Sequence, residues 1–274
     1  MSNQVQVPMN TLSNQLKQLI EKAIQIRSAE FTEIVKLYKD VFKRYSLRLR
    51  PSVNSISLVS CANWTPQIGF SKMTSGSTLE KTLEGLKSGD DKLELPDRPT
   101  PEKALQSWLI SQAMGSEGRM SAIDSALDDD HSYWFVSDEI ALTAPDKDGA
   151  SGNRVVADLL VVREDKKNGE CEIVNVELKS QRTTETHEQI QTFWDFMGPS
   201  EIQLWRKFAE TMLEGKQLRW KQNNGRKGIV IWPGPLSESR PNPRTVEMIT
   251  KLRAEGVDTI CYSGPIYNFR PERI

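Results

Sequence analysis

The stretch from Val155 to Lys179 reads VVADLLVVREDKKNGECEIVNVELK, in which two apolar, β-branched runs flank a charged turn. The turn contains Asn168-Gly169, a dipeptide that favours the positive φ angles of a type I′ turn. The stretch therefore predicts a β-hairpin. If Asn168 and Gly169 are the two loop residues, Lys167 faces Glu170, and this pairing sets the register of both strands.

That register brings three charged side chains together. Counting back along both strands places Asp158 opposite Lys179, and Glu177, two residues from Lys179, lies on the same face. Two carboxylates among Val, Leu and Ile residues are costly without a partner. A divalent cation would hold them together despite their mutual repulsion. A simple salt bridge between Lys179 and Asp158 is the alternative that needs no cation.

The segments around the hairpin predict the rest of the fold. Periodicity, capping and turn signals predict one helix or two in series from about Asn10 to before Pro51, a strand at 55–59, a helix opened by Ser77-x-x-Glu80 and closed by Gly89, a helix from Thr100, a strand at 133–142, the hairpin strands at 154–162 and 172–179, one long or two consecutive helices at 186–214, a strand at 227–232, a helix at 243–254 and a strand at 257–262. A Gly-, Asp- and Pro-containing linker at 88–100 separates residues 1–95 from residues 96–274.

The aspartate, the triplet Glu177-Leu178-Lys179 and this order of elements together resemble the PD-(D/E)XK phosphodiesterase superfamily, the restriction-endonuclease-like nucleases. The resemblance covers about residues 100 to 263, and it departs from the family at Ala157, where a proline often stands. It implies an α/β fold with a mixed sheet and an αβββαβ core at 96–274. Residues 1–95 would then be a mainly helical appendage for dimerisation, target recognition or partner binding.

The resemblance also implies an activity, namely Mg²⁺-dependent hydrolysis of DNA phosphodiester bonds, with Mn²⁺ as an alternative ion. Asp158, Glu177 and the Leu178 carbonyl would hold the ion, which keeps several waters. Lys179 would orient the attacking water or accept its proton, and would stabilise developing negative charge. Glu102, near the start of its helix, is similar to a glutamate that completes the acidic cluster in many relatives, although the helix dipole alone favours an acid there.

Basic, amide and aromatic side chains around the hairpin are candidates for nucleic-acid contact. These candidates are Arg182, Gln189, Gln191, Arg219, Lys221, Arg226 and Lys227. The glutamines follow the E-x-K strand, where some relatives carry a Gln, but the exonuclease-type Q-x-x-x-Y pattern is met only as Gln189-x-x-x-Phe193. An ordinary exposed loop would have the same composition as residues 219–227. The basic run from Lys36 to Arg50 is either a further phosphate contact or a solvated helix face.

Composition excludes some classes and leaves others open. The 36 basic and 37 acidic residues create no global field for a polyanion, so a nucleic-acid surface has to be local. The three cysteines are far apart and predict no disulfide framework, and no apolar run approaches the ~18 residues of a membrane span, which favours a cytoplasmic protein. The expected partners are DNA and further copies of the chain or another protein. The alternatives are RNA cleavage and a non-catalytic nucleic-acid-binding or scaffold protein that retains the fold.

Overall fold

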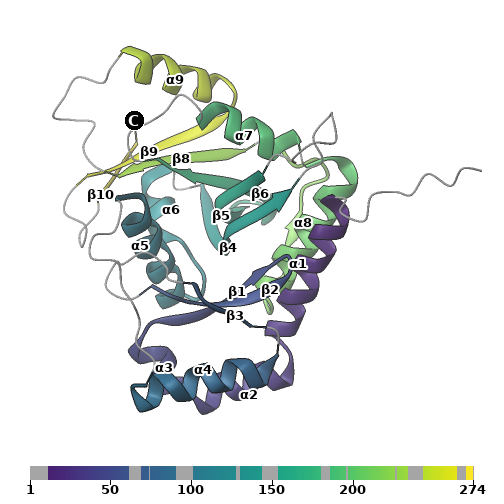
Figure 1. Ribbon diagram of the computed structural model, residues 1–274. Helices are drawn as coiled ribbons and strands as arrows, with labels where there is room; N and C mark the ends of the chain where they lie inside the picture. Colours follow the sequence, from purple (N-terminus) through teal and green to yellow (C-terminus); the bar gives the residue numbers. More distant parts are fainter. Residues whose placement is uncertain are drawn as a thin grey trace, which may run out of the picture.

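The computed structural model describes residues 12–61, 69–73, 75–90, 101–127, 130–143, 154–179, 186–195, 197–225, 227–233, 243–263 and 270–273. Within these residues the chain is mixed α/β, with one sheet of seven strands and one of three (Figure 1). The α/β class with a mixed sheet, expected from the sequence, is confirmed.

The bounds of the elements are as follows. The helices are α1 (Leu12–Ile26), α2 (Ala29–Leu37), α3 (Lys39–Arg44), α4 (Gly76–Ser88), α5 (Pro101–Gly115), α6 (Ser121–Leu127), α7 (Thr186–Asp195), α8 (Pro199–Met212) and α9 (Pro243–Ala254). The strands are β1 (Leu47–Ser52), β2 (Ser55–Ser60), β3 (Gly69–Met73), β4 (His131–Thr143), β5 (Arg154–Asp165), β6 (Glu170–Leu178), β7 (Arg219–Trp220), β8 (Gly228–Pro233), β9 (Val257–Ser263) and β10 (Arg270–Arg273).

The large sheet has the strand order β10-β9-β8-β6-β5-β4, and β7 pairs with the first residues of β6. Strands β4, β5 and β6 form an antiparallel meander, whereas β6, β8 and β9 run parallel to one another. The parallel strands require crossover connections, and α7, α8 and α9 lie in them. The elements predicted from Thr100 onward are all present, and α6, β7 and β10 are additional.

The turn between β5 and β6 is longer than the sequence predicted. Gly169 adopts a left-handed conformation (φ 71°), and its amide donates a 2.7 Å hydrogen bond to the Asp165 carbonyl. The Asp165 carboxylate accepts hydrogen bonds from the amides of Lys167 (2.8 Å) and Asn168 (3.3 Å), which stabilises a loop of four residues. The predicted two-residue type I′ turn is therefore wrong, because the aspartate makes the longer loop more stable.

The register changes with the turn. The ladder pairs Leu159 with Val176, and continuing it by one pair places Asp158 opposite Glu177 rather than Lys179. The shift is two residues, and side chains alternate with a period of two, so every side chain keeps its predicted face. The three charged groups therefore still lie on one face, although the predicted turn is wrong.

Helices cover both faces of the large sheet (Figure 1). One core packs the sheet against α5 and α6, through residues such as Leu105, Leu109 and Ile123. The other core packs it against α1, α7, α8 and α9 and contains Trp205 and Phe208. Within the described residues, no helix is long and apolar enough to cross a membrane.

Gly228 allows α7 to approach the second face closely. A Cβ atom at this position would lie 3.3 Å from the Ile190 side chain and 3.5 Å from that of Trp194. Gly228 pairs with Asn175 of β6, so α7 crosses the sheet beside the strand that carries Glu177.

The N-terminal region differs most from its prediction. The expected long helix is divided into α1, α2 and α3, and the first break occurs at Ser28, whose hydroxyl accepts a hydrogen bond of 3.4 Å from the Phe31 amide. The chain then enters β1, which contains Pro51; proline is tolerated there because β1 lies at the edge of the small sheet. Within the described residues, the region therefore combines the helices α1 to α4 with the three-stranded sheet of β1 to β3.

The apolar seam of α1 is covered within the chain. Leu16, Leu19 and Ala23 are buried in the core that α1 shares with α8 and the large sheet. Self-association through a coiled coil would need this seam to be exposed. Dimerisation, and the division of the chain near residue 95, stay predictions, and a dimer would use a different surface.

Two residues of the predicted basic helix face lie in strand β1 instead, with side chains only 10% and 15% exposed. Arg48 and Arg50 both form ion pairs with Asp138 of β4, at 3.3 Å for Arg50, and Asp138 is fully buried. These arginines therefore join the small sheet to the large one and do not belong to a solvated surface. One carboxylate holds two guanidinium groups, so its removal leaves buried cations without a counterion.

We expect Asp138→Asn to lower the free energy of unfolding by about 3–5 kcal/mol, since a buried charge pair loses one partner. The measurement is urea unfolding. A matched control is Glu33→Gln, which removes an ion pair between side chains that are 70% and 65% exposed and should change stability by less than ~1 kcal/mol. Equal effects of the two substitutions would show that Asp138 does not act as the counterion.

Candidate active site

Strands β5 and β6 place two carboxylates beside each other. Leu178 donates its amide hydrogen to Asp158 Oδ2 at 2.8 Å, which fixes the aspartate against β6. Lys179 Nζ lies 3.3 Å from Glu177 Oε2, and Asn175 Nδ2 donates to the other oxygen of Glu177 at 3.1 Å. Glu177 is only 3% exposed. The predicted convergence of Asp158, Glu177 and Lys179 is therefore present, with Lys179 paired to Glu177.

Both acids have perturbed pKa values. The pKa of Glu177 is raised to about 8, first by burial and then by the negative charge of Asp158, while Lys179 and the Asn175 amide oppose the rise. Burial also raises the pKa of Asp158, against the lowering effects of the Leu178 amide and Lys179. Strongly perturbed acids beside one another are typical of functional sites. The pair retains a proton near neutral pH unless a further positive charge is supplied.

A third acid, which the sequence did not single out, approaches from β4. Glu139 neighbours Asp158 across the strand pair and has a left-handed backbone (φ 49°), an unusual conformation for this residue type. Gln106 of α5 donates to Glu139 Oε1 at 2.9 Å and to the Asp158 carbonyl at 3.1 Å. Lys103 pairs with the same Glu139 oxygen. Helix α5 thus holds one edge of the acidic cluster.

Glu102 is the acid that the sequence predicted at this site. It lies in the first turn of α5 and is partly exposed. In the part of the chain that the structure describes, no three or more His, Cys, Asp and Glu side chains are grouped as metal ligands. The role of Glu102 stays a prediction, whereas the negative charge of Glu139 acts on Asp158 and raises its pKa.

The donor set at Asp158 nevertheless fits Mg²⁺. Asp158 Oδ1 accepts no hydrogen bond from the described residues, so it is available to a cation. The Leu178 amide points toward β5, and a strand residue directs its N–H and C=O to the same neighbour, so the Leu178 carbonyl points there too. Two carboxylates and one carbonyl are sufficient, because Mg²⁺ keeps several waters. A cation here would also oppose the effects of burial and of Asp158 that raise the pKa of Glu177.

The predicted nucleic-acid contacts are scattered. Arg182 and Arg226 lie outside the described residues. Gln189 is exposed on α7, whereas Gln191 donates to Glu255, which also binds His187. Lys227 is partly exposed, and its carbonyl accepts a 3.2 Å hydrogen bond from the Trp194 ring nitrogen.

Arg219 and Lys221 lie at the opposite end of β6 from the carboxylates. Arg219 pairs with Glu170 in the strand ladder, seven residues before Glu177, which is roughly 20 Å along an extended strand. Lys221 Nζ forms a 3.3 Å ion pair with the buried Glu172. These two cations therefore do not lie beside the carboxylates, because β7 (Arg219–Trp220) extends the sheet at the start of β6, and their contact with nucleic acid stays a prediction.

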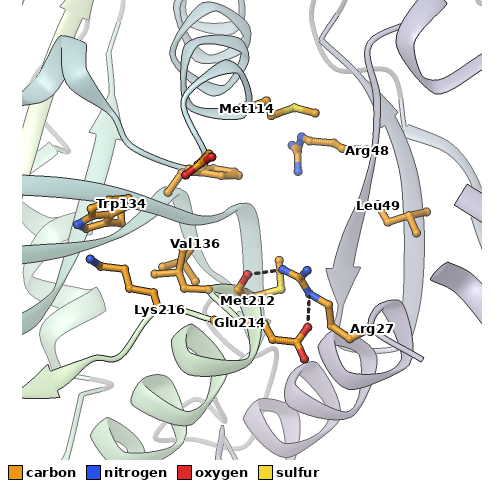
Figure 2. A pocket seen from close by; sticks show the side chains of 14 residues that line it. Arg27, Arg48, Leu49, Met114, Trp134, Val136, Met212, Glu214 and Lys216 are labelled. Atoms are coloured by element: carbon orange, nitrogen blue, oxygen red, sulfur yellow. Dashed lines mark hydrogen bonds and ion pairs between the residues drawn. The ribbon is translucent and has the colours of Figure 1, made fainter. Parts of the chain in front are cut away.

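A hollow of about 860 Å³ lies elsewhere, where β1, β4 and the loops after α5 and α8 meet (Figure 2). Its walls include Met114, Val136 and Leu213, and none of its lining residues belongs to the carboxylate cluster. Two aromatic rings, Trp134 and Phe135, also line it. By size alone it would be the default ligand site.

The cations in this hollow are already engaged within the protein, and Figure 2 shows the contacts of Arg27. Lys216 Nζ lies 3.7 Å from the centroid of the Trp134 ring and forms an ion pair with Glu164 at 2.8 Å. Arg48 lies over the Phe135 ring and forms an ion pair with Asp138. Arg27 donates a hydrogen bond of 2.6 Å to the Met212 carbonyl. A cationic side chain of the protein therefore already lies over the face of each of the two aromatic rings. We interpret the hollow as the junction between the N-terminal region and the large sheet.

Comparisons with protein-family models, with curated proteins and with solved structures found no match for this chain. Arguments about function therefore come from its own residues.

We expect the free energy of unfolding, measured in chelator, to fall as pH rises from about 4.5 to about 8. In this pH range the folded protein keeps a proton on Glu177, whereas the unfolded chain, in which the pKa is 4.5, releases it. The electrostatic cost of burying a charged carboxylate therefore does not affect stability below this range and lowers it fully above the range. In Glu177→Gln the fall should be shallower.

Urea unfolding at several pH values gives this profile. The exposed Glu247 provides the control variant Glu247→Gln, which should follow the wild type. Parallel profiles for wild type and Glu177→Gln would contradict the perturbed titration. Mg²⁺ should stabilise the wild type most at pH 8, where the pair is most negative, and should have less effect on Glu177→Gln.

Proposed function

We propose that this chain is a Mg²⁺-dependent nuclease that hydrolyses DNA phosphodiester bonds, an endonuclease with a restriction-endonuclease-like core. The observation that carries the proposal is the Asp158–Glu177 carboxylate pair on neighbouring strands with Lys179 at 3.3 Å from Glu177. Two further features support it. The elements α5, β4, β5, β6, α7 and β8 follow one another in the expected order, and the acids lie on the second and third of these strands.

Each residue has a role in this proposal that its contacts favour. Asp158, Glu177 and the Leu178 carbonyl hold the metal ion, which when bound neutralises phosphate charge and lowers the pKa of a coordinated water. The Leu178 amide and Asn175 fix the two carboxylates before substrate arrives. Such preorganisation avoids reorganisation during the reaction.

Lys179 is the positive group closest to the reacting phosphate in this arrangement. Its ammonium lies 3.3 Å from Glu177 Oε2 and would turn toward the phosphate once another cation occupies the site. There it orients the attacking water and stabilises charge that develops on the phosphate oxygens. Its side chain is 15% exposed, which limits competing contacts with solvent.

The alternative is a nucleic-acid-binding or scaffold protein that keeps the fold without catalysis. A scaffold has no need of two adjacent buried acids, since apolar residues of similar size would stabilise the sheet equally well or better. Retention of Asp158, Glu177 and Lys179 together therefore favours catalysis. A role in restriction, phage defence or mobile elements is part of the proposal, and RNA is the substrate to be tested beside DNA.

We expect Asp158→Asn and Lys179→Met to lower the rate of Mg²⁺-dependent DNA cleavage by roughly a hundredfold or more, since each removes a charge needed in the transition state. The measurement incubates supercoiled plasmid, linear duplex, single-stranded DNA and RNA with purified protein, in Mg²⁺ and in chelator. The distribution of products separates internal from terminal cleavage.

The matched controls are Asp40→Asn and Lys17→Met, which change exposed residues of α3 and α1 in the same chemical way and should retain wild-type rates. Cleavage by Lys179→Met at the rate of the controls would exclude the assigned role of Lys179. Binding of DNA without cleavage by the wild type in any divalent metal would favour the scaffold alternative.

A further inference from the structure

A second hollow, of about 340 Å³, lies between the start of α8 and the loop formed by residues 222–225. Its apolar wall includes Trp194, Met197 and Ile202. This volume is at the lower end of the range of small-ligand sites, about 300–1,000 Å³. The hollow is on the same face of the large sheet as α7 and α8. Glu177 also lies on this face, because it is four residues from Ile173 along β6 and side chains in a strand alternate with a period of two.

A buried cation lines this hollow. Arg206 is 7% exposed, and one of its terminal nitrogens donates to the Lys221 carbonyl at 2.6 Å. Within the described part of the chain, its Nε has no hydrogen-bond partner and no carboxylate forms an ion pair with it. Glu210, whose charge acts on Arg206, accepts a hydrogen bond from the Trp220 ring nitrogen at 2.8 Å and pairs with Lys207 at 3.8 Å.

The missing counterion points to an anionic ligand. A buried guanidinium without a carboxylate partner is costly, and an anion in the hollow would offset that cost. Guanidinium groups present several N–H donors in a plane, which suits phosphate. Arg206 also lies over the Trp220 ring, at 5.5 Å from its centroid, which fixes its orientation.

Free amides surround the opening. Gln203, Gln222 and Asn223 line the hollow, are exposed, and have no hydrogen-bond partner among the residues that the structure describes. Asn224, by contrast, is committed to the fold, since it accepts from the Ile173 amide at 2.8 Å and donates to the Ile173 carbonyl at 3.2 Å. This clamp holds the loop in place and leaves its neighbours available to a ligand.

We propose that this hollow binds one adenine nucleotide unit, with its phosphate on Arg206, its base against the apolar wall and the edge of its base on the amides of Gln203, Gln222 and Asn223. Asn and Gln side chains pair with the N6 and N7 positions of adenine through two hydrogen bonds, which is the chemistry these amides offer. The nucleotide is either free in solution or an unpaired residue of a nucleic-acid strand. Only the second case rests on the proposed function.

The binding test uses isothermal titration calorimetry on the full chain. Wild type is titrated with AMP, UMP and inorganic phosphate, and Asp158→Asn, which cannot cleave, is titrated with oligo(dA) and oligo(dT). We expect AMP to bind roughly tenfold or more tightly than UMP, the discrimination typical of one bidentate amide contact.

Two sets of variants locate the site. Arg206→Met should weaken AMP and phosphate binding by about tenfold or more, while the matched control Arg253→Met, an exposed arginine of α9 outside the hollow, should leave both unchanged. The exposed pair Gln222→Ala and Asn223→Ala, combined in one protein, should retain phosphate affinity and lose the preference for AMP over UMP. Circular dichroism checks that Arg206→Met is folded, and the amide variant tests the site independently of it.

The outcomes separate the two proposals. Equal binding of AMP and UMP by the wild type, or unchanged AMP binding in both sets of variants, would overturn the nucleotide site. Tighter binding of oligo(dA) than of AMP assigns the hollow to a strand, and the reverse order assigns it to a free nucleotide. Because these titrations measure no cleavage, an inactive wild-type protein would contradict the proposed nuclease and leave this inference standing.

Discussion

Two carboxylates that must share a small, buried space dominate the structure around β5 and β6. Asp158 and Glu177 are neighbours on adjacent strands, and Glu177 is almost completely removed from solvent. Like charges in such a place are unfavourable, and the local structure is organised to reduce that cost. An amide of the backbone, an asparagine and a lysine each contact one of the carboxylates, and helix α5 contributes Gln106 from the side of β4.

The same constraint explains why the site was visible in the sequence although the turn was predicted incorrectly. Charged residues in an apolar strand are conspicuous, and the period of two along a strand preserves the face of each residue under any even shift. Asp165 displaced the register by exactly such a shift, so Asp158 and Glu177 still meet. Local signals also located two helices, since Gly89 closes α4 and Pro101 starts α5 as predicted. The predicted N-cap of α4 is wrong, because Ser75 caps the helix, two residues before Ser77.

What the sequence did not reveal depends on contacts between distant segments. Glu139 and Gln106 are 33 residues apart, and only the packing of α5 on the sheet brings them together. A signal was present, since Asp138 and Glu139 interrupt an otherwise apolar strand next to the one that carries Asp158. Arg48 was predicted to lie on a basic helix face because an arginine in a run of basic residues suits an exposed surface. Its buried partner, Asp138, is 90 residues away in the sequence, so no local sign of the ion pair was present in the sequence.

Strand β6 connects the two candidate sites in one physical frame. Glu177 lies near the end of β6 and Lys179 directly follows the strand, while the backbone of Ile173 is hydrogen-bonded to Asn224 of the loop that borders the second hollow. The separation of Ile173 and Glu177 is four residues, roughly 13 Å of extended strand, which a few nucleotides would span. Both sites face the side of the sheet that α7 covers. A rigid strand fixes such a distance more firmly than a loop does, so a base held in the hollow would determine which phosphate reaches the carboxylates. In that arrangement sequence preference would come from the amides and cleavage from the acids, and substitutions at one site would change one property without the other.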